Sequence, residues 1–174
     1  MTVAVAAVLT ALAVPVQAKP SAYALGDSVM LGARDQLKAR GFTVDAKVSR
    51  QASAGPAILR KLGDRLPRDV IVHFGTNGSY PLKTCEDIVR IAGPERRVFL
   101  VTVKVPRAWE GTNNRMLRTC ASRFPKGRAT VVDWHWASSR RPGWLYADGY
   151  HLRPDGAKHF ARIMSEAIER ANAS

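Results

Sequence analysis

The chain alternates short apolar segments with stretches of helical periodicity, and this alternation restricts its fold more than any other feature. Strands are predicted at Ala22–Leu25, Phe42–Val48, Asp69–Phe74, Arg97–Val103 and Ala129–Trp134. Helices are predicted between and after them, at Val29–Arg40, Pro56–Leu66, Cys85–Ala92, Asn113–Phe124 and Pro154–Ala171. Apolar strands that are each followed by a helix favour a parallel sheet covered on both faces. Right-handed crossovers then give a three-layer α/β/α sandwich with a five-stranded parallel sheet.

In such sheets, ligands bind in the crevice beyond the carboxyl ends of the strands. The residues that follow each predicted strand are therefore the first candidates for a functional site. They are Ser28, the stretches after Val48 and Phe74, and the loops around Ala108 and His135.

The 174 residues suit one domain with a full core. Residues 1–18 carry no charge, are almost wholly apolar and end in Val16-Gln17-Ala18, which resembles a small-residue cleavage site. We interpret this segment as a secretory signal peptide, although it lacks the Lys or Arg usual near the start of one. The alternatives are a residual membrane segment, for which it is short, and a buried helix. Residues 19–174 are then an extracytoplasmic domain, either secreted or anchored to the membrane.

The formal net charge of the chain is +13. A charge of this size attracts polyanions such as nucleic acid, anionic lipid and acidic wall polymers. The basic residues are spread along the chain singly or in short pairs, and no zinc-finger, RNA-recognition or helix-turn-helix pattern accompanies them. We therefore expect a solvated basic surface and no specific site for nucleic acid.

Cys85 and Cys120 are the only cysteines in the sequence. An even number of cysteines in an exported chain favours a disulfide. The bridge would close a loop of about 35 residues. Two buried free thiols are the alternative.

Gly26-Asp27-Ser28 lies where the first predicted strand passes into a helix. Gly26 permits a sharp turn, and a residue at a helix N-terminus has a free backbone N–H. A serine held there can act as a nucleophile while its own N–H stabilises a developing oxyanion. Because serine is also a favoured N-cap residue, a purely structural role for Ser28 is the alternative.

Two further segments could complete such a site. In Asp148-Gly149-Tyr150-His151, ahead of the last helix, His151 could accept the proton of Ser28 while Asp148 orients the imidazole. In Gly75-Thr76-Asn77-Gly78, after an apolar strand, the Asn77 amide could donate to an oxyanion. Alternatively, each segment is only a polar turn, and His151 is an ordinary surface residue.

Together and in this order, the three segments resemble the conserved blocks of the SGNH hydrolase superfamily, the GDSL-type esterases and lipases. The resemblance covers residues 19–174 and implies a flavodoxin-like α/β fold. It also implies that Ser28 is the nucleophile, that Asp148 and His151 complete the triad, and that Asn77 is an oxyanion donor. We expect no cofactor and no metal.

This sequence departs from the usual family pattern in the second conserved block. In Val48-Ser49-Arg50-Gln51, Arg50 stands in for the usual Gly whose N–H joins the oxyanion hole, and the neighbouring Ser49 is the other candidate. Gly-Asp-Ser-Val-Met and Val-Ser-Arg-Gln together suggest a narrower resemblance. They are similar to the exported SGNH domain fused to bacterial membrane acyltransferases, including peptidoglycan O-acetyltransferases. That resemblance implies an envelope saccharide as substrate and a membrane acyltransferase as partner.

Several aromatic and histidine residues fall near the predicted site. Trp144 and Tyr146, just ahead of Asp148, are the best candidates for stacking on a sugar, with loop packing as the alternative. His73, at the end of an apolar strand, is expected to be a core histidine, and His159 to lie on the exposed face of the last helix. A metal site is the alternative to serine chemistry, but its residues match no zinc spacing; they are Asp133, His135, Asp148 and His151.

We therefore expect a monomeric serine-dependent acyl-ester hydrolase or O-acyltransferase that acts on O-acetylated envelope saccharides or similar esters. The rival is a non-catalytic module on the same fold that binds the envelope or a polyanion. The set of Ser28, Asn77, Asp148 and His151 favours the enzyme, because binding alone needs none of these residues.

Overall fold

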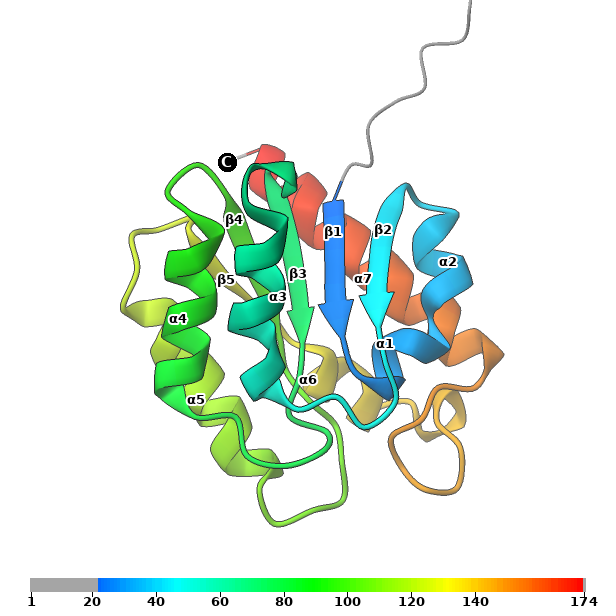
Figure 1. Ribbon diagram of the computed structural model, residues 1–174. Coiled ribbons are helices and arrows are strands. Elements are labelled where there is room, and N and C mark those ends of the chain that lie inside the picture. Colours follow the sequence, from blue (N-terminus) through cyan, green and yellow to red (C-terminus); the bar gives the residue numbers. More distant parts are fainter. Residues whose placement is uncertain (1–21, 174) are drawn as a thin grey trace, which may run out of the picture.

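The structure, a computed structural model, describes residues 22–173. The predicted signal peptide, residues 1–18, lies outside the described residues. One sheet with the strand order β2-β1-β3-β4-β5 runs through the molecule, and all of its strands are parallel (Figure 1). The strands are β1 (Ala22–Gly26), β2 (Phe42–Ala46), β3 (Asp69–His73), β4 (Arg97–Val101) and β5 (Ala129–Val132).

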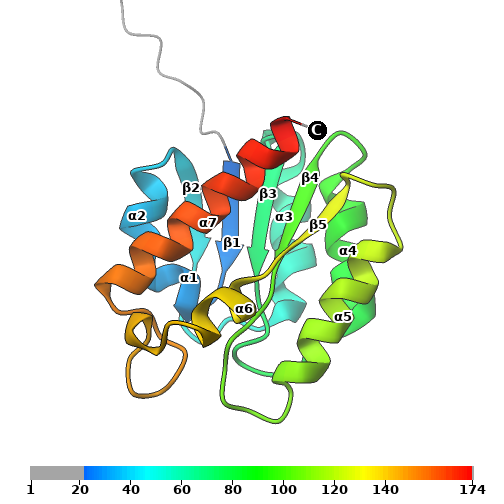
Figure 2. The ribbon, with the colours of Figure 1, turned by 180° about the vertical axis from the view of Figure 1, so that it is seen from behind.

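Helices cover both faces of the sheet, as Figures 1 and 2 show from opposite sides. One face carries α3 (Gly55–Leu62), α4 (Leu82–Ala92) and α5 (Glu110–Ser122). The other carries α1 (Ser28–Gly32), α2 (Arg34–Lys38), α6 (Trp134–Ser139) and α7 (Pro154–Asn172). Short 3₁₀ helices lie at η1 (Ala52–Ala54), η2 (Gly63–Arg65) and η3 (Pro142–Trp144).

Alternate residues of each strand enter two separate cores. In β1, Ala22 and Ala24 face α7, whereas Tyr23 and Leu25 face the side of α3 and α4. Side chains that leave a strand alternately on both faces are what a sheet buried on both sides requires. The predicted three-layer α/β/α fold with five parallel strands is confirmed.

The strands expected over Phe42–Val48 and Arg97–Val103 end two residues early, at Ala46 and Val101. The helix expected over Pro56–Leu66 ends at Leu62. Two other local predictions were wrong in a more informative way. The helix expected over Val29–Arg40 is divided into α1 and α2 at Ala33. The strand expected to reach Trp134 ends at Val132, because Asp133 caps α6 by accepting a hydrogen bond from the N–H of Trp136 at 3.1 Å. An apolar tryptophan that begins a buried helix cannot be told from the end of a buried strand by its hydropathy alone.

The disulfide between Cys85 and Cys120 is formed and joins α4 to α5. Both residues are fully buried in the core on the α3–α5 face of the sheet. Within residues 22–173, no helix combines the length and the apolar character that a membrane crossing needs.

Candidate active site

The candidate site lies where the order of the strands reverses. The chain passes from β1 to β2 on one side and then crosses to β3 on the other, so the carboxyl ends of β1 and β3 border the crevice between the two crossovers. This is the usual ligand position in an open α/β sheet. Ser28 follows β1, and the loop that starts at Gly75 follows β3.

Asp27, not Ser28, is the N-cap of α1. Its Oδ1 accepts a hydrogen bond from the N–H of Val29 at 3.1 Å. The hydroxyl of Ser28 is therefore not needed to cap the helix. Gly26 makes the preceding turn possible, because a Cβ there would lie 2.7 Å from the Cβ of Met30 and 3.0 Å from the carbonyl oxygen of His73. The cap alternative for Ser28 thus loses its structural basis.

The structure brings Ser28, His151 and Asp148 into one chain of contacts. The Oγ of Ser28 lies 3.0 Å from Nε2 of His151, across 123 positions of sequence. The Nδ1 of His151 lies 2.7 Å from Oδ2 of Asp148. With Nδ1–H donating to the carboxylate, Nε2 is free to accept the proton of Ser28.

Asp148 also shapes the turn that carries His151. Its Oδ1 accepts hydrogen bonds from the N–H groups of Tyr150 (3.1 Å) and His151 (3.0 Å), while Gly149 adopts a φ of 80°. Burial of the carboxyl opposes its ionisation. The hydrogen bonds from the Tyr150 N–H and from the side chain and N–H of His151 outweigh that effect and hold the pKa of Asp148 below its ordinary value. The carboxylate is therefore charged at neutral pH.

The loop that carries Asn77 is held from several sides. Gly75 and Gly78 adopt φ values of 107° and 141°, which favour glycine. The buried Asn113 donates from Nδ2 to the carbonyls of Gly75 (3.0 Å) and Gly78 (2.8 Å). The indole N–H of Trp109 also donates to Gly75, at 3.1 Å. This part of the backbone is thus fixed before any substrate binds.

The buried pair of Asp27 and His73 links this loop to the turn that holds Ser28. Asp27 Oδ1 lies 3.3 Å from Nδ1 of His73, and Asp27 Oδ2 accepts a 3.4 Å hydrogen bond from the N–H of Thr76. Asp27 and His73 are both buried, as expected for His73. One carboxylate therefore contacts the N–H of Val29 just after Ser28, the end of β3 and the Asn77 loop.

The second block differs from the expectation that Arg50 supplies a backbone donor. The N–H of Arg50 donates to the carbonyl of Lys47 at 3.3 Å, and its guanidinium binds the Asp45 carboxylate at 2.7 Å. Ser49, by contrast, has a φ of 58°, the left-handed conformation that a glycine adopts most easily. Its N–H has no hydrogen-bond partner among residues 22–173. Ser49 therefore has the backbone conformation expected at a glycine position, and Arg50 ties the ends of β1 and β2 by donating to the carbonyls of Gly26 and Asp45.

The Asn77 side chain lies against this second block. Its Nδ2 is 3.5 Å from the carbonyl oxygen of Arg50, a long and weak contact. The side chain of Gln51 donates to the Asn77 carbonyl at 2.8 Å. The second and third blocks are therefore neighbours, and the Asn77 amide can leave its weak contact for a stronger acceptor.

The aromatic residues divide into packing and surface groups. The Trp144 ring stacks against Trp134 (centroids 5.9 Å apart) and against His159 (4.1 Å). These partners place Trp144 in the packing between α6 and α7, which favours the loop-packing alternative over stacking on a substrate. His159 is half-buried rather than exposed. Tyr146 is 50% exposed and lies beneath Arg153, so it stays available to a ligand.

The four residues considered for a metal site do not converge on one point but contact different side chains. Asp133 binds Thr102 and Arg118, and His135 lies 2.9 Å from Glu110. In the part of the chain that the structure describes, no three His, Cys, Asp or Glu residues are grouped so that they could hold a metal ion.

Asn113 and Gln51 are the supporting residues that the sequence did not reveal. Asn113 was expected only as the start of a helix, and its partners Gly75 and Gly78 lie 38 and 35 positions away. The role of Asn113 is indicated by its burial on a helix beside a glycine-rich loop, and this proximity is visible only in the structure.

The parallel sheet, its strand order and the residues at its carboxyl edge define the class of fold: the chain has the SGNH hydrolase fold. No model of a known protein family matches it. Among curated proteins, it is 32% identical over 159 residues to YrhL of Bacillus subtilis and 30% identical over 156 residues to the O-acetyltransferase OatA of Staphylococcus aureus. These matches cover 89% and 87% of this chain but 25% of each relative, so the chain spans about a quarter of their length.

Solved structures share the fold. The C-terminal catalytic domain of peptidoglycan O-acetyltransferase A from Streptococcus pneumoniae aligns with a TM-score of 0.77 and 22% identity, over 88% of this chain and 94% of that one. A GDSL-like lipase from Bacteroides thetaiotaomicron aligns with a TM-score of 0.68 and 18% identity, over 92% and 93% of the two chains.

Proposed function

We propose that the protein is a serine-dependent acyl-ester enzyme, a hydrolase or an O-acyltransferase, that acts on O-acetylated saccharides of the cell envelope. The observation that carries the proposal is the continuous contact from Ser28 Oγ through His151 to Asp148, at 3.0 and 2.7 Å. A hydroxyl, an imidazole and a carboxylate in this order are the parts of a nucleophilic triad.

The first half of the reaction forms an acyl-enzyme. Ser28 Oγ attacks the ester carbonyl carbon as its proton passes to Nε2 of His151, and Asp148 stabilises the imidazolium. The oxyanion accepts hydrogen bonds from the Ser28 N–H and the Asn77 amide, and from the N–H of Ser49 in the second block. Collapse breaks the bond to the leaving alcohol, which takes the proton from His151, and the acyl group stays on Ser28.

The second half decides between hydrolysis and transfer. Water or a saccharide hydroxyl gives its proton to His151 and attacks the acyl carbon. The bond to Ser28 Oγ breaks, and the serine recovers its proton from His151. Water releases the free acid, whereas a saccharide hydroxyl becomes the new ester.

The substrate class rests on the relatives. Two of the similar proteins carry the names O-acetyltransferase OatA and peptidoglycan O-acetyltransferase A, and another solved structure of the same fold is a carbohydrate esterase. The buried Cys85–Cys120 disulfide suits an oxidising compartment and so an extracytoplasmic place of action. A membrane acyltransferase is the proposed partner that supplies acetyl groups.

The test is the release of p-nitrophenol from p-nitrophenyl acetate by the full chain, with and without chito-oligosaccharide. Ser28→Ala is compared with Ser122→Ala, which makes the same chemical change on the exposed surface of α5. We expect Ser122→Ala to keep the wild-type rate. Since general base catalysis contributes about 10²–10⁴-fold, Ser28→Ala should lose at least that factor. Equal rates for the wild type and Ser28→Ala would refute the mechanism. Acetylated sugar among the products would assign transfer, and acetate alone would assign hydrolysis.

A further inference from the structure

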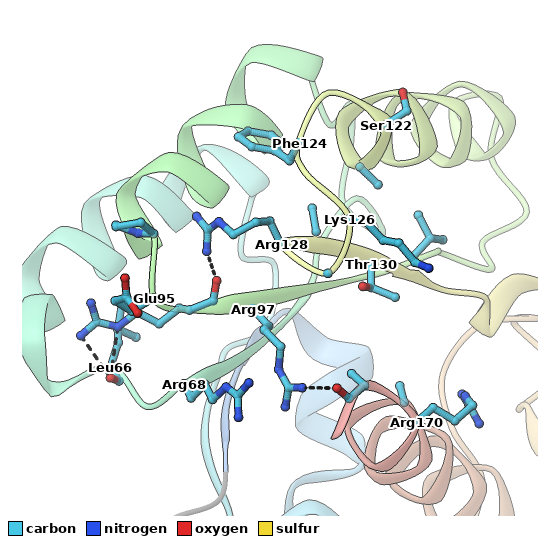
Figure 3. Close-up of a pocket in the computed structure, with 18 residues that line it drawn as sticks. Leu66, Arg68, Glu95, Arg97, Ser122, Phe124, Lys126, Arg128, Thr130 and Arg170 are labelled. Carbon is cyan, nitrogen blue, oxygen red and sulfur yellow. Dashed lines mark hydrogen bonds between the residues drawn. The ribbon is translucent and has the colours of Figure 1, made fainter. Parts of the chain in front are cut away.

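Figure 3 shows the residues that line a broad basic groove. They lie around the starts of the strands, at the end of the sheet away from Ser28. The groove has a volume of about 1520 Å³ and is bordered by the loops that lead into β3, β4 and β5 and by the end of α7. One acidic residue, Glu95, lines it. Its cationic residues are Arg68, Arg96, Arg97, Lys126, Arg128 and Arg170.

The arginines in the wall of the groove differ in how far their charge is neutralised. Arg97 is paired with Asp69 at 2.6 Å and also binds the carbonyl of Ala171, so it builds the wall of the groove but its charge is compensated. Arg128 donates to the backbone carbonyls of Arg96 and Val89 and thus keeps its full charge. Carbonyl groups fix a guanidinium but cancel no charge, so the groove wall is electrostatically positive.

Two further cations are exposed at the groove. In the described part of the chain, neither Arg68 nor Lys126 makes an ion pair or a side-chain hydrogen bond, and both are exposed. Figure 3 shows Arg68 beside the start of β3 and Lys126 in the loop before β5. The groove can therefore present at least three uncompensated charges to an anionic ligand.

The groove faces the end of the sheet at which the chain enters the fold. All strands are parallel, so Ala22 at the start of β1 lies at the same edge as the residues before β3, β4 and β5 that line the groove. Since neighbouring strands are about 4.8 Å apart, the start of β4 lies about 10 Å from the start of β1. In the alternative in which the apolar segment 1–18 stays as a membrane segment, only residues 19–21 link it to β1, and three extended residues span at most about 11 Å.

We propose that this groove binds the phosphate groups of anionic phospholipids and holds this end of the sheet against a bilayer. Anionic lipid surfaces attract clusters of Lys and Arg, with about 1 kcal/mol for each residue near the surface. Five-residue strands of about 3.3 Å per residue place the carboxyl edge roughly 15 Å further out. The groove therefore orients the candidate active site away from the lipid and towards the polymers outside it.

The test measures binding of the full chain to vesicles of phosphatidylcholine alone and with added phosphatidylglycerol. The groove variant is Arg68→Gln with Lys126→Gln. The matched control is Lys47→Gln with Arg107→Gln, which removes the same charge from exposed positions beyond β2 and β4, at the opposite edge. All of these proteins keep segment 1–18, so a difference between them reports on the removed charges alone.

We expect the wild type to prefer the anionic vesicles, and this preference to fall with added salt. The groove variant should bind them roughly 30-fold more weakly, since two charges of about 1 kcal/mol each are removed, while the control pair changes binding less than about threefold. The groove variant should also keep the wild-type rate on p-nitrophenyl acetate, which shows that it is folded. Lipid binding is thus read independently of the proposed ester chemistry.

Three results would overturn the proposal. One is equal binding to neutral and anionic vesicles. Another is the same loss in both charge pairs, which would assign the attraction to net charge. The third is a loss of binding to soluble poly(glycerol phosphate) in the groove variant with vesicle binding unchanged, which would assign the groove to a wall polymer.

Discussion

The disulfide between Cys85 and Cys120 should contribute a large share of the stability of this domain. It closes a loop of 35 residues. The chain-entropy relation for a loop of this length gives about 4 kcal/mol at 25 °C, by restricting the unfolded chain. For a protein of this size, 1 kcal/mol corresponds to about 2–4 °C in Tm. Replacing both cysteines with alanine should therefore lower Tm by about 8–16 °C, as followed by circular dichroism.

The single variants provide the control for this prediction. Cys85→Ala, Cys120→Ala and the double variant all break the same bond, so their losses of unfolding free energy should be nearly equal rather than additive. Wild-type protein that has been reduced while unfolded should match them. If the double variant loses less than about 1 kcal/mol, or if the two single losses add up, the loop argument is wrong.

The remaining predictions concern the candidate site. Asn77→Ala should lower kcat on p-nitrophenyl acetate by about 10²–10³-fold and leave a measurable remnant, because one oxyanion donor is lost; an unchanged kcat would remove Asn77 from the hole. Asp148→Asn should lower kcat/KM by about 10³–10⁴-fold. Because the pKa of Asp148 is depressed, the stability that its charge contributes is fully present at any pH above the ordinary carboxyl pKa. That stability is lost as the pH falls through the lowered pKa. The deficit of Asp148→Asn in a pH–rate profile should therefore already be present at pH 5, and a deficit that appears only at higher pH would contradict this. Ser49→Gly should raise the unfolding free energy by up to about 1 kcal/mol in urea, since glycine adopts the φ of 58° without strain; a destabilised variant would argue against Ser49 as the glycine position.

The fold could be predicted because its signals are local. Each strand is a short apolar run bounded by turn residues, and β1, β3 and β4 begin where they were expected to begin. The predicted triad residues are also brought together, since Ser28 and His151 both lie at the carboxyl edge of a parallel sheet. Residues at strand ends converge whatever their separation in sequence.

The support of the site could not be predicted because it depends on contacts between distant segments. Nothing near Asn113 in the sequence indicates that its amide holds Gly75 and Gly78. The choice between Arg50 and Ser49 likewise depends on backbone dihedrals that residue identity does not give. The contacts of Trp144 could not be predicted for the same reason, because its stacking partner His159 lies on a separate helix.

The central claim is that the acyl group passes through Ser28. The most direct measurement is mass spectrometry of the full chain, quenched in acid shortly after mixing with p-nitrophenyl acetate and then digested. The account predicts the added mass of one acetyl group on the peptide that contains Ser28, and its absence in Ser28→Ala. An acetyl group on another residue that turns over at the rate of hydrolysis, or hydrolysis that continues undiminished in Ser28→Ala, would contradict it.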